Sequence, residues 1–342
     1  MALTDKEINQ IREELQTCKK PLIFFHDDAD GLCSFLLLYR YIKEGKGIIV
    51  KTTPDVDEKF IKKVEEYQPD KIFIVDLAIV QQEFIDKIKP KIIWIDHHKP
   101  LKRENVLYFN PRKHDKEDNT PVSSLCYQVV QQDMWIAAAG AIADWHWPYF
   151  IEEFRKEYPD LLPESIDNPE DALFETKLGK LIDIISFSLK GTTQDALKYA
   201  KIFTRIKTPY EILDQETPKG KYIYKNFEKI DKEYQNMLKK ALKVKPRGKI
   251  LLFEYQSGKM SFTKDIANEL LHRNPDKLTI IAREKDGEMK MSIRSKNIII
   301  PPILEKALKE TEGYGGGHEH ACGANVKKQD FERFLDIFKK NL

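Results

Sequence analysis

The feature that most constrains this chain is a strand pattern that ends in three potential metal ligands. The run Ile92-Ile93-Trp94-Ile95 consists of β-branched and aromatic residues, which is typical of a buried strand. It is followed at once by Asp96-His97-His98 and then by Lys99-Pro100, where the proline ends regular structure. An isolated Asp-His-His is also compatible with an ordinary polar loop, so its meaning depends on partners elsewhere in the chain.

Strands and helices alternate along the first part of the chain. Four apolar runs have the composition of strands, and they lie at residues 22–25, 47–51, 72–75 and 92–95. Three helical patterns separate them, at residues 32–42, 57–67 and 81–88. This alternation predicts an α/β fold with a doubly wound, mostly parallel sheet and right-handed crossovers. In such sheets ligands bind at the carboxyl ends of the strands, near the point where the strand order reverses.

Acidic residues follow three of these strands at the point where each strand ends. Asp28 and Asp30 come after the first strand, Asp76 after the third and Asp96 after the fourth. Aspartate is also favoured as a helix N-cap, which could account for any one of them but is hard to extend to all of them at one sheet edge. A further acid, Asp144, ends a helix of small residues, where a negative charge opposes the helix dipole. That mismatch favours a functional role for Asp144.

The chain of 342 residues is long enough for two domains, and its patterns divide it into three parts. Residues 1–150 form the α/β unit, and residues 151–245 continue it with short helices and a charged connector helix at 228–244, whose charges we expect to be solvated. A smaller α/β domain follows at 246–342, in which Asp286-Gly287 between two β-like runs predicts a hairpin.

Composition narrows the class of protein. There are 57 basic and 55 acidic residues, so the net charge of +2 argues against a protein that holds nucleic acid by bulk charge, and any polyanion site must be local. No apolar run approaches the length of a membrane span, and the first residues lack the apolar core of a signal peptide, so we expect a cytoplasmic protein without a membrane partner. The four cysteines are widely separated, which predicts reduced buried thiols.

The acids and histidines at the strand ends have the chemistry of a metal site. Carboxylates with some imidazole nitrogen suit divalent metals such as manganese or magnesium, whereas a structural zinc site would favour thiolates. The number of candidate ligands fits two ions better than one. Two metals about 3.5–4 Å apart are the usual arrangement for phosphoryl transfer, with a shared acid between them and an activated water as nucleophile.

Together these motifs resemble those of the DHH phosphoesterase superfamily, with a C-terminal domain of the DHHA1 type. The resemblance covers nearly the whole chain. Asp28-Ala29-Asp30-Gly31 resembles the first motif, Asp76 the second, Asp96-His97-His98 the third and Asp144 the fourth. The resemblance implies that the doubly wound sheet belongs to a DHH domain, which a helical connector joins to the smaller α/β DHHA1 domain.

The resemblance also implies a role for each motif residue. The implied metal ligands are Asp28, Asp30, Asp76, His97 and Asp144, with Asp76 as the bridge between two ions, Mn²⁺ preferred and Mg²⁺ possible. Asp96 would orient the histidine that follows it, and His98 would lie near the attacking water. In several branches of the family a histidine four residues before the first aspartate also binds metal. Here that position is Phe24, while His26 stands two residues before Asp28, which makes His26 a candidate ligand or general acid.

In the second domain, Ser292-Ile293-Arg294-Ser295 and Gly315-Gly316-Gly317-His318 resemble substrate-binding motifs. Backbone N–H groups of the glycines can approach an anion closely because no Cβ intervenes, and Arg294 can bind a phosphate with two hydrogen bonds. His318 would face the phosphate. A glycine triplet by itself is also compatible with a flexible turn. We expect Trp145 and Trp147 to pack rather than to stack on a base.

The leading functional prediction is a metal-dependent phosphodiesterase that acts as an exonuclease on single-stranded DNA or RNA or on short oligonucleotides, resembling the RecJ-like and oligoribonuclease-like branches. One alternative is a phosphoesterase acting on a cyclic dinucleotide or 3′-phosphoadenosine 5′-phosphate. Another is a scaffold of a replication complex, because members of this superfamily have kept the fold while losing ligands. A replication or repair protein is a further possible partner.

Overall fold

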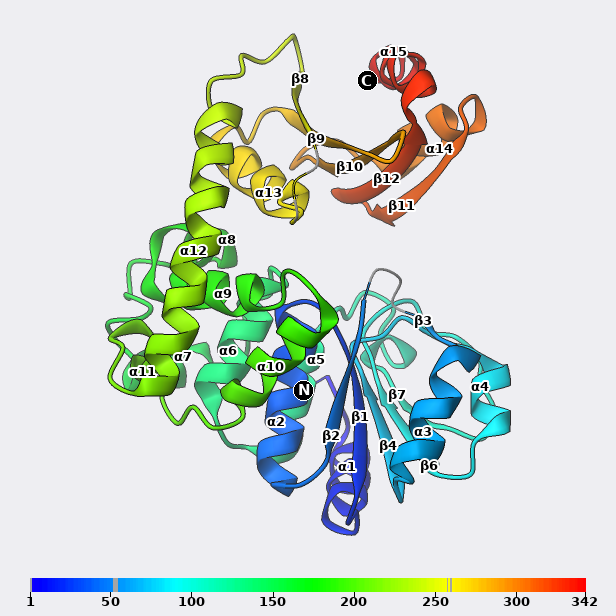
Figure 1. Ribbon diagram of the computed structural model, residues 1–342, viewed down its shortest axis with the longest axis vertical. Coiled ribbons are helices and arrows are strands. Elements are labelled where there is room, and N and C mark those ends of the chain that lie inside the picture. The colour runs from blue at the N-terminus through cyan, green and yellow to red at the C-terminus, as the bar shows by residue number, and fades with distance from the viewer. Residues whose placement is uncertain (1, 52–54, 257, 259) are drawn as a thin grey trace. The chain divides into compact units, whose positions relative to one another are not determined.

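The computed structural model describes residues 2–51, 55–256, 258 and 260–342. Its contacts divide the chain into two compact units, Met1–Glu228 and Lys229–Leu342 (Figure 1). The division falls within a single helix, α12 (Pro218–Ala241). The domain limits expected at residues 150 and 245 remain predictions.

The N-terminal unit is built around a five-stranded parallel sheet. Its strand order is β2-β1-β4-β6-β7, with bounds Lys46–Val50, Pro21–His26, Lys71–Val75, Lys91–Ile95 and Leu107–Phe109. The predicted doubly wound parallel sheet is therefore confirmed. Because the chain runs from β1 outward to β2 and then to β4 on the other side of β1, the strand order reverses between β1 and β4, which is where such folds bind ligands.

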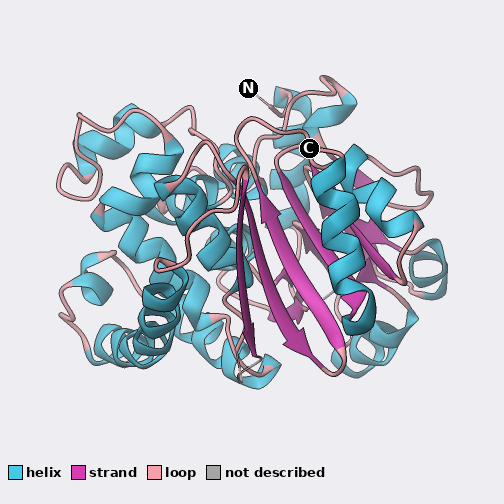
Figure 2. Ribbon diagram, turned by 90° about the horizontal axis from the view of Figure 1, so that it is seen from above, coloured by secondary structure: helices cyan, strands magenta, loops and turns pink. Residues whose placement is uncertain are grey.

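Helices lie on both sides of this sheet. Figure 2 distinguishes the helices and strands of both units by colour. On one face, Phe60, Val64 and Phe84 pack in one core with Phe24, Ile74 and Trp94 of the sheet. The elements of this side are η1 (Glu58–Phe60), α3 (Ile61–Tyr67) and α4 (Gln82–Lys87), beside the small sheet of β3 (Asp55–Val56) and β5 (Ile79–Val80). The other side carries α1 (Asp5–Gln16), α2 (Ala29–Ile42), α5 (Val122–Val130) and α6 (Met134–Ala143).

A helical region follows the sheet. Its elements are α7 (Ile151–Glu157), α8 (Pro169–Glu175), α9 (Lys177–Ser188), α10 (Thr193–Phe203), α11 (Tyr210–Leu213) and α12. The predicted limits of the connector helix, 228–244, were wrong, because α12 begins at Pro218 and ends at Ala241. Proline is tolerated in the first helical turn, and Gly220 is needed there because an added Cβ would lie 1.5 Å from the Glu211 carbonyl oxygen.

The C-terminal unit contains a second five-stranded sheet in the order β11-β12-β10-β9-β8. The strand bounds in that order are Gly313–His318, Ala321–Lys327, Glu288–Arg294, Leu278–Lys285 and Ile250–Gln256. Strands β8 and β9 are parallel and the other pairs are antiparallel. The predicted hairpin is confirmed: Lys285 pairs with Glu288, and the φ angles of Asp286 and Gly287 are 54° and 76°.

The glycine triplet lies in strand β11 rather than in a turn. Three helices complete the unit, α13 (Thr263–Arg273), α14 (Pro301–Lys309) and α15 (Phe331–Lys340), together with η3 (Lys328–Asp330). In the first unit, η2 (Pro111–Lys113) follows β7.

All four cysteines are buried and unbridged, as predicted. Within the described part of the chain, no helix has both the length and the apolar character needed to cross a bilayer.

Candidate metal centre

The first DHH-type motif sits where β1 gives way to α2. Asp28 is the N-cap of α2, and its Oδ1 accepts a hydrogen bond from the Gly31 N–H at 3.1 Å. Gly31 permits this tight strand-to-helix connection, because an added Cβ would lie 2.5 Å from the His26 carbonyl oxygen. The helix begins at Ala29, so Asp30 falls in its first turn. The connection thereby holds both aspartates close to the carboxyl end of β1.

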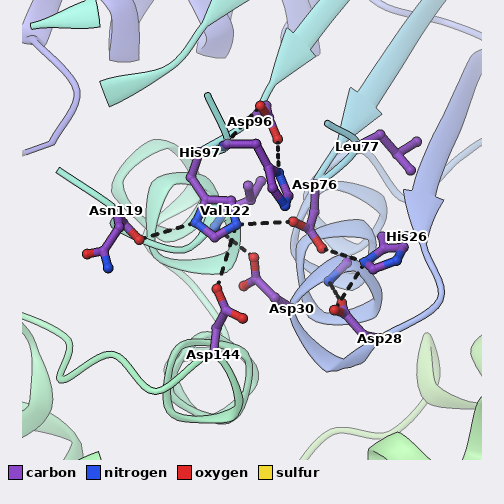
Figure 3. Close-up of polar contacts among 12 residues, drawn as sticks. His26, Asp28, Asp30, Asp76, Leu77, Asp96, His97, Asn119, Val122 and Asp144 are labelled. Carbon is purple, nitrogen blue, oxygen red and sulfur yellow. Dashed lines mark hydrogen bonds and ion pairs between the residues drawn. The ribbon is translucent and has the colours of Figure 1, made fainter. Parts of the chain in front are cut away.

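Asp76 lies at the centre of the cluster, directly after β4 (Figure 3). Its Oδ2 is 3.5 Å from His26 Nδ1 and its Oδ1 is 3.5 Å from His97 Nε2. His26 Nδ1 is also 3.1 Å from Asp28 Oδ2, and His97 Nε2 is 3.6 Å from Asp144 Oδ2. Side chains that the sequence marks as metal ligands or candidate ligands, from separate segments of the chain, therefore converge on Asp76.

The backbone at Asp76 is unusual, because its φ angle of 55° places it in the left-handed region. Non-glycine residues adopt this conformation at an energetic cost, and such residues are often found at functional sites. The Asp76 Oδ2 atom is buried and has no hydrogen-bond partner among the described residues. A buried carboxylate oxygen without a protein donor is suited to a bound cation.

Asp30 is one of two buried acids, with Asp76, that face His97. Its two oxygens accept the Val122 and Ser123 N–H groups at 2.8 and 2.9 Å, so it also anchors the start of α5. Burial, together with the neighbouring Asp76 and Asp144 carboxylates, raises the pKa of Asp30 well above its ordinary value, although His97 opposes the shift. The carboxylates of the site are therefore close enough to one another that their negative charges repel.

The two inner histidines respond to this charge. Burial alone disfavours an imidazolium, but the carboxylates of Asp28 and Asp76 raise the pKa of His26 well above its ordinary value. The pKa of His97 is also raised well above its ordinary value despite burial, by Asp76, Asp144 and Asp30. His97 Nδ1 lies 3.2 Å from the Asn119 carbonyl oxygen, which can fix this nitrogen as the donor and leave Nε2 facing the acids.

Asp96 is paired with His98, not with the adjacent His97 that we expected it to orient. Asp96 Oδ1 lies 2.7 Å from His98 Nδ1, and Asp96 Oδ2 accepts the His98 N–H at 3.1 Å. Tyr108 Oη and Asn110 Nδ2 also donate to Oδ2, each at 3.3 Å. Asp96 is fully buried and its oxygens are satisfied by protein donors. Its geometry fits a residue that positions His98.

The donor set fits divalent metal ions. Three groups of side chains each offer ligand atoms that lie within 4.8 Å of one another, namely Asp76, His97 and His98; His26, Asp28 and Asp76; and Asp30, His97 and Asp144. Asp76 belongs to the first and second groups and His97 to the first and third, as expected for adjacent metal sites. Oxygen donors with a few imidazoles suit Mn²⁺ or Mg²⁺, and such ions supply charge that stabilises a reacting phosphoryl group and acidifies water.

Sequence reasoning missed several residues that support the cluster. Tyr108 and Asn110 belong to the short strand β7 and its exit, which a three-residue pattern does not reveal. Lys51 was also missed; its ammonium lies 3.9 Å from Asp27 Oδ2, beside His26. Lys51 follows β2 directly, in the same position relative to its strand as the acids, but an ammonium group is not a metal ligand and so does not stand out in a search for ligands.

Four of the predicted substrate-binding residues of the C-terminal unit, Ser292, Arg294, Gly316 and His318, share one face of its sheet. Ser292 and Gly316 both pair with Gly323 of the intervening strand β12, and Arg294 and His318 both pair with Ala321. Residues in register on neighbouring strands point to the same side. On β10 this side alternates with the buried Met291 and Ile293.

Arg294 is held firmly within this unit. Its Nε donates to Asn268 Oδ1 at 2.8 Å, and its Nη1 donates to the Cys322 and Ile293 carbonyls at 3.2 and 2.9 Å. Burial lowers the pKa of Arg294 to about 10, so the guanidinium is charged at neutral pH.

Gly316 and Gly317 differ in what their backbones require. An added Cβ at Gly316 would meet nothing within 4 Å. At Gly317, where φ is 148°, an added Cβ would lie 2.3 Å from the Ala321 carbonyl oxygen. Packing therefore explains Gly317 and leaves Gly316 without a structural reason. The same stretch of β11 is exposed throughout.

Several known proteins resemble this chain in sequence or in fold. The chain is 23% identical to an uncharacterized protein of Methanocaldococcus jannaschii, over 92% of this chain and 91% of that protein. RecJ of Thermus thermophilus in complex with Mn²⁺ matches all of this chain with a TM-score of 0.73 and 16% identity; the chain spans 55% of that protein. A manganese-bound exonuclease RecJ matches with a TM-score of 0.66 and 15% identity, over 100% of this chain and 95% of that one.

A pGpG-specific phosphodiesterase of Vibrio cholerae has a TM-score of 0.52 and 13% identity, over 93% of this chain and 99% of that one. These likenesses show a shared fold. The model of the DHH family N-terminal domain matches residues 20–157, and the model of the DHHA1 domain matches residues 247–342. The chain therefore combines a DHH-family N-terminal domain with a DHHA1 domain.

Proposed function

We propose that this protein is a Mn²⁺- or Mg²⁺-dependent phosphodiesterase that releases mononucleotides from the end of single-stranded DNA or RNA. The observation that carries the proposal is the convergence of Asp28, Asp30, Asp76, His97 and Asp144 at one sheet edge, with a buried Asp76 oxygen that accepts no hydrogen bond from the described residues. The RecJ structures that share its fold are described as manganese- or magnesium-bound, which is consistent with the proposed metals.

The residues of the cluster divide the work. The four aspartates and His97 named above would hold two ions, with Asp76 between them. His26 would be an additional ligand on the Asp28 side. His98, fixed by Asp96, would donate a hydrogen bond to a phosphoryl oxygen or accept one from the attacking water. The bound ions would stabilise negative charge on the phosphoryl oxygens and lower the pKa of the attacking water.

The C-terminal unit would grip the substrate away from the scissile bond. Arg294, His318 and Ser292 offer polar side chains on one sheet face, and the N–H groups of Gly315 to Gly317 belong to the neighbouring edge strand β11. A Gly316→Ala variant should raise KM and leave the unfolding temperature unchanged, because its Cβ meets open space. The matched variant Gly317→Ala should unfold at lower temperature. Unchanged KM in a stable Gly316→Ala protein would contradict the proposed grip.

The proposal is tested with end-labelled oligonucleotides. Purified protein with Mn²⁺ or Mg²⁺ should release labelled mononucleotides from single-stranded DNA or RNA, and separate 5′ and 3′ labels give the polarity. The variant His97→Ala should fold and lose turnover. Failure to release nucleotides from either polymer with any divalent metal would contradict the exonuclease proposal.

A second candidate is hydrolysis of a small phosphoester by the same cluster. It is favoured by the fold shared with a pGpG-specific phosphodiesterase along almost the full length of both chains. Rates on a linear dinucleotide, a cyclic dinucleotide, 3′-phosphoadenosine 5′-phosphate and longer oligonucleotides, measured side by side, separate the two candidates. A preference for the small compounds at equal concentration would favour the second.

A further inference from the structure

The outer surface of the helical region in the N-terminal unit combines lysine with exposed tyrosine. In the first half of α12, Ile223 and Phe227 face the core. Lys221 and Lys225 point to solvent, and Tyr222 is 41% exposed. A helix that buries one stripe of apolar residues places its remaining charges on the opposite side, so these two lysines form an exposed ridge.

Tyr222 and Lys198 form a fixed pair on one flank of this ridge. The Lys198 ammonium on α10 donates to the Tyr222 hydroxyl and lies 4.7 Å from the centre of its ring. The Tyr222 ring stacks on the buried Tyr199 with the ring centres 5.7 Å apart. The aromatic ring and the cation beside it are therefore held in place before any ligand arrives.

A similar pair lies on the other flank. Lys180 on α9 donates to the Tyr224 hydroxyl at 2.6 Å, and its ammonium lies 5.0 Å from the ring centre. Cations and aromatic rings thus alternate across three helices. We call Lys180, Lys198, Lys221, Tyr222, Tyr224 and Lys225 the lysine–tyrosine track.

Helix α10, which carries Lys198, packs against β2 at the edge of the parallel sheet. Lys51, at the end of β2, donates to the Leu189 and Gly191 carbonyls at 2.7 and 3.2 Å, just before α10 begins. The same ammonium lies 3.9 Å from the carboxylate of Asp27, next to His26. Lys51 therefore joins the segment that carries the track to the segment that carries the candidate ligands.

The charge balance of this region differs from that of the chain. Residues 177–228 contain ten lysines and arginines against six acids, whereas the whole chain has 57 against 55. Two of the six acids serve local structure: Asp195 caps α10 through Thr192, and the buried Glu211 accepts the Lys207 N–H. The excess of positive charge remains on the solvent side.

We propose that the lysine–tyrosine track binds single-stranded nucleic acid whose end lies at the metal centre. Lysines neutralise backbone phosphates, and tyrosine faces stack on bases without regard to sequence. The proposal rests on the proposed function and deepens it, because a track outside the metal centre favours strands of several nucleotides over dinucleotides. An acidic protein would also meet the cations, but it would not account for the ordered tyrosine rings.

The test compares substrates of two lengths. The variant Lys198→Gln, Lys221→Gln, Lys225→Gln loses three cations of the track. The matched control, Lys62→Gln, Lys63→Gln, Lys89→Gln, loses three exposed cations from the side of the sheet that carries α3 and α4. For a single strand of about 16 nucleotides, the track variant should raise KM about tenfold with kcat unchanged, and reduce the slope of log KM against log salt by roughly 2. For a dinucleotide, both variants should match the wild-type protein.

Equal effects on both substrates, or equal effects of both triple variants, would overturn the track. If the wild-type protein cleaves no substrate, the proposed function fails and the track is judged by the anisotropy of a fluorescent single strand. Binding that only the track variant weakens supports it, and binding that is absent or unaffected overturns it.

The aromatic part has its own test. Tyr222→Ala should raise KM severalfold more on an ordinary strand than on a strand of abasic nucleotides, because the lost stacking surface matters only where a base is present, whereas the lost contact with Lys198 affects both strands. Tyr222→Phe keeps the ring and should behave like the wild-type protein on both. An equal loss on abasic strands would show that Tyr222 does not stack on bases.

Discussion

Among the buried carboxylates of the N-terminal unit, Glu14 and Asp30 lie in opposite electrostatic surroundings. Glu14 on α1 is 9% exposed and Asp30 on α2 is 2% exposed. Burial raises the pKa of both, but at Glu14 the ammonium groups of Lys71 and Lys91 outweigh it and lower the pKa below its ordinary value. Asp30 instead faces two further carboxylates, and its pKa is raised well above its ordinary value.

The difference separates a charge that stabilises the fold from one that is kept for a ligand. The Glu14 carboxylate has a lysine ammonium 2.7 Å away, in Lys71, and a second one in Lys91. Among the described residues, the acids around Asp30 face the imidazoles of His26 and His97, while the Lys51 ammonium lies 3.9 Å from Asp27 Oδ2. An excess of buried negative charge costs stability unless a cation from solution completes it. The same chemical change, from carboxylate to amide, should therefore have opposite consequences at the two sites.

The largest effect is expected at the metal centre. Asp76→Asn should lower kcat on the best oligonucleotide at least about 1000-fold, which corresponds to roughly 4 kcal/mol. Its unfolding temperature without metal should not fall, because asparagine tolerates the left-handed backbone at this position and the change removes one of the charges that raise the pKa of Asp30. The matched change Glu14→Gln should leave kcat unchanged. Activity retained by Asp76→Asn would mean that the two sites do not differ as argued.

Metal binding should produce the next largest effect. Mn²⁺ at 100 times its dissociation constant should stabilise the wild-type protein by about 2.7 kcal/mol, seen as a higher unfolding temperature. Glu14→Gln should keep this shift, since its carboxylate lies outside the cluster, and Asp76→Asn should lose most of it. A shift of equal size in Asp76→Asn would place the ion elsewhere on the protein.

Much of this cluster could be predicted from the sequence, because the periodic patterns fix where strands end. Once β1, β4 and β6 are aligned in parallel, their carboxyl ends bring Asp28, Asp76 and His97 to one edge. Asp144 was identified by its conflict with the helix dipole, and it lies at the C-cap of α6, 3.6 Å from His97. These residues follow from regular elements whose geometry is known in advance.

The parts that could not be predicted depend on irregular backbone or on distant packing. The pairing of Asp96 with His98 depends on how the chain turns after β6, which no periodicity describes. The glycine triplet forms strand β11, where Gly315 and Gly317 lie too close to β12 to carry a Cβ. The need for glycine at these two positions arises only in the folded sheet, so the sequence alone does not reveal it. The register that puts Gly316 in line with Ser292 likewise exists only in that sheet.

A smaller effect is expected at the balanced site. Glu14→Gln should lower the free energy of unfolding by about 1–3 kcal/mol, because it removes the buried partner of Lys71 and Lys91. The loss is limited because Lys71 still donates to the Glu14 carbonyl oxygen at 3.0 Å and to the Thr17 hydroxyl. Urea unfolding at neutral pH measures it. An unchanged free energy of unfolding would remove the distinction between a stabilising charge and a ligand.

The smallest effect is the pH dependence of that contribution. Because the pKa of Glu14 is lower in the folded protein than its ordinary value of 4.5, the unfolded chain takes up a proton first as the pH falls. The stabilisation is complete above this ordinary value and disappears as the pH falls through the lowered pKa. The difference in unfolding free energy between the wild-type protein and Glu14→Gln should therefore shrink below about pH 4.5 and stay constant above it. Subtracting one protein from the other cancels the other acids, so a difference that grows at low pH would mean that the two lysines do not hold Glu14 in its charged form.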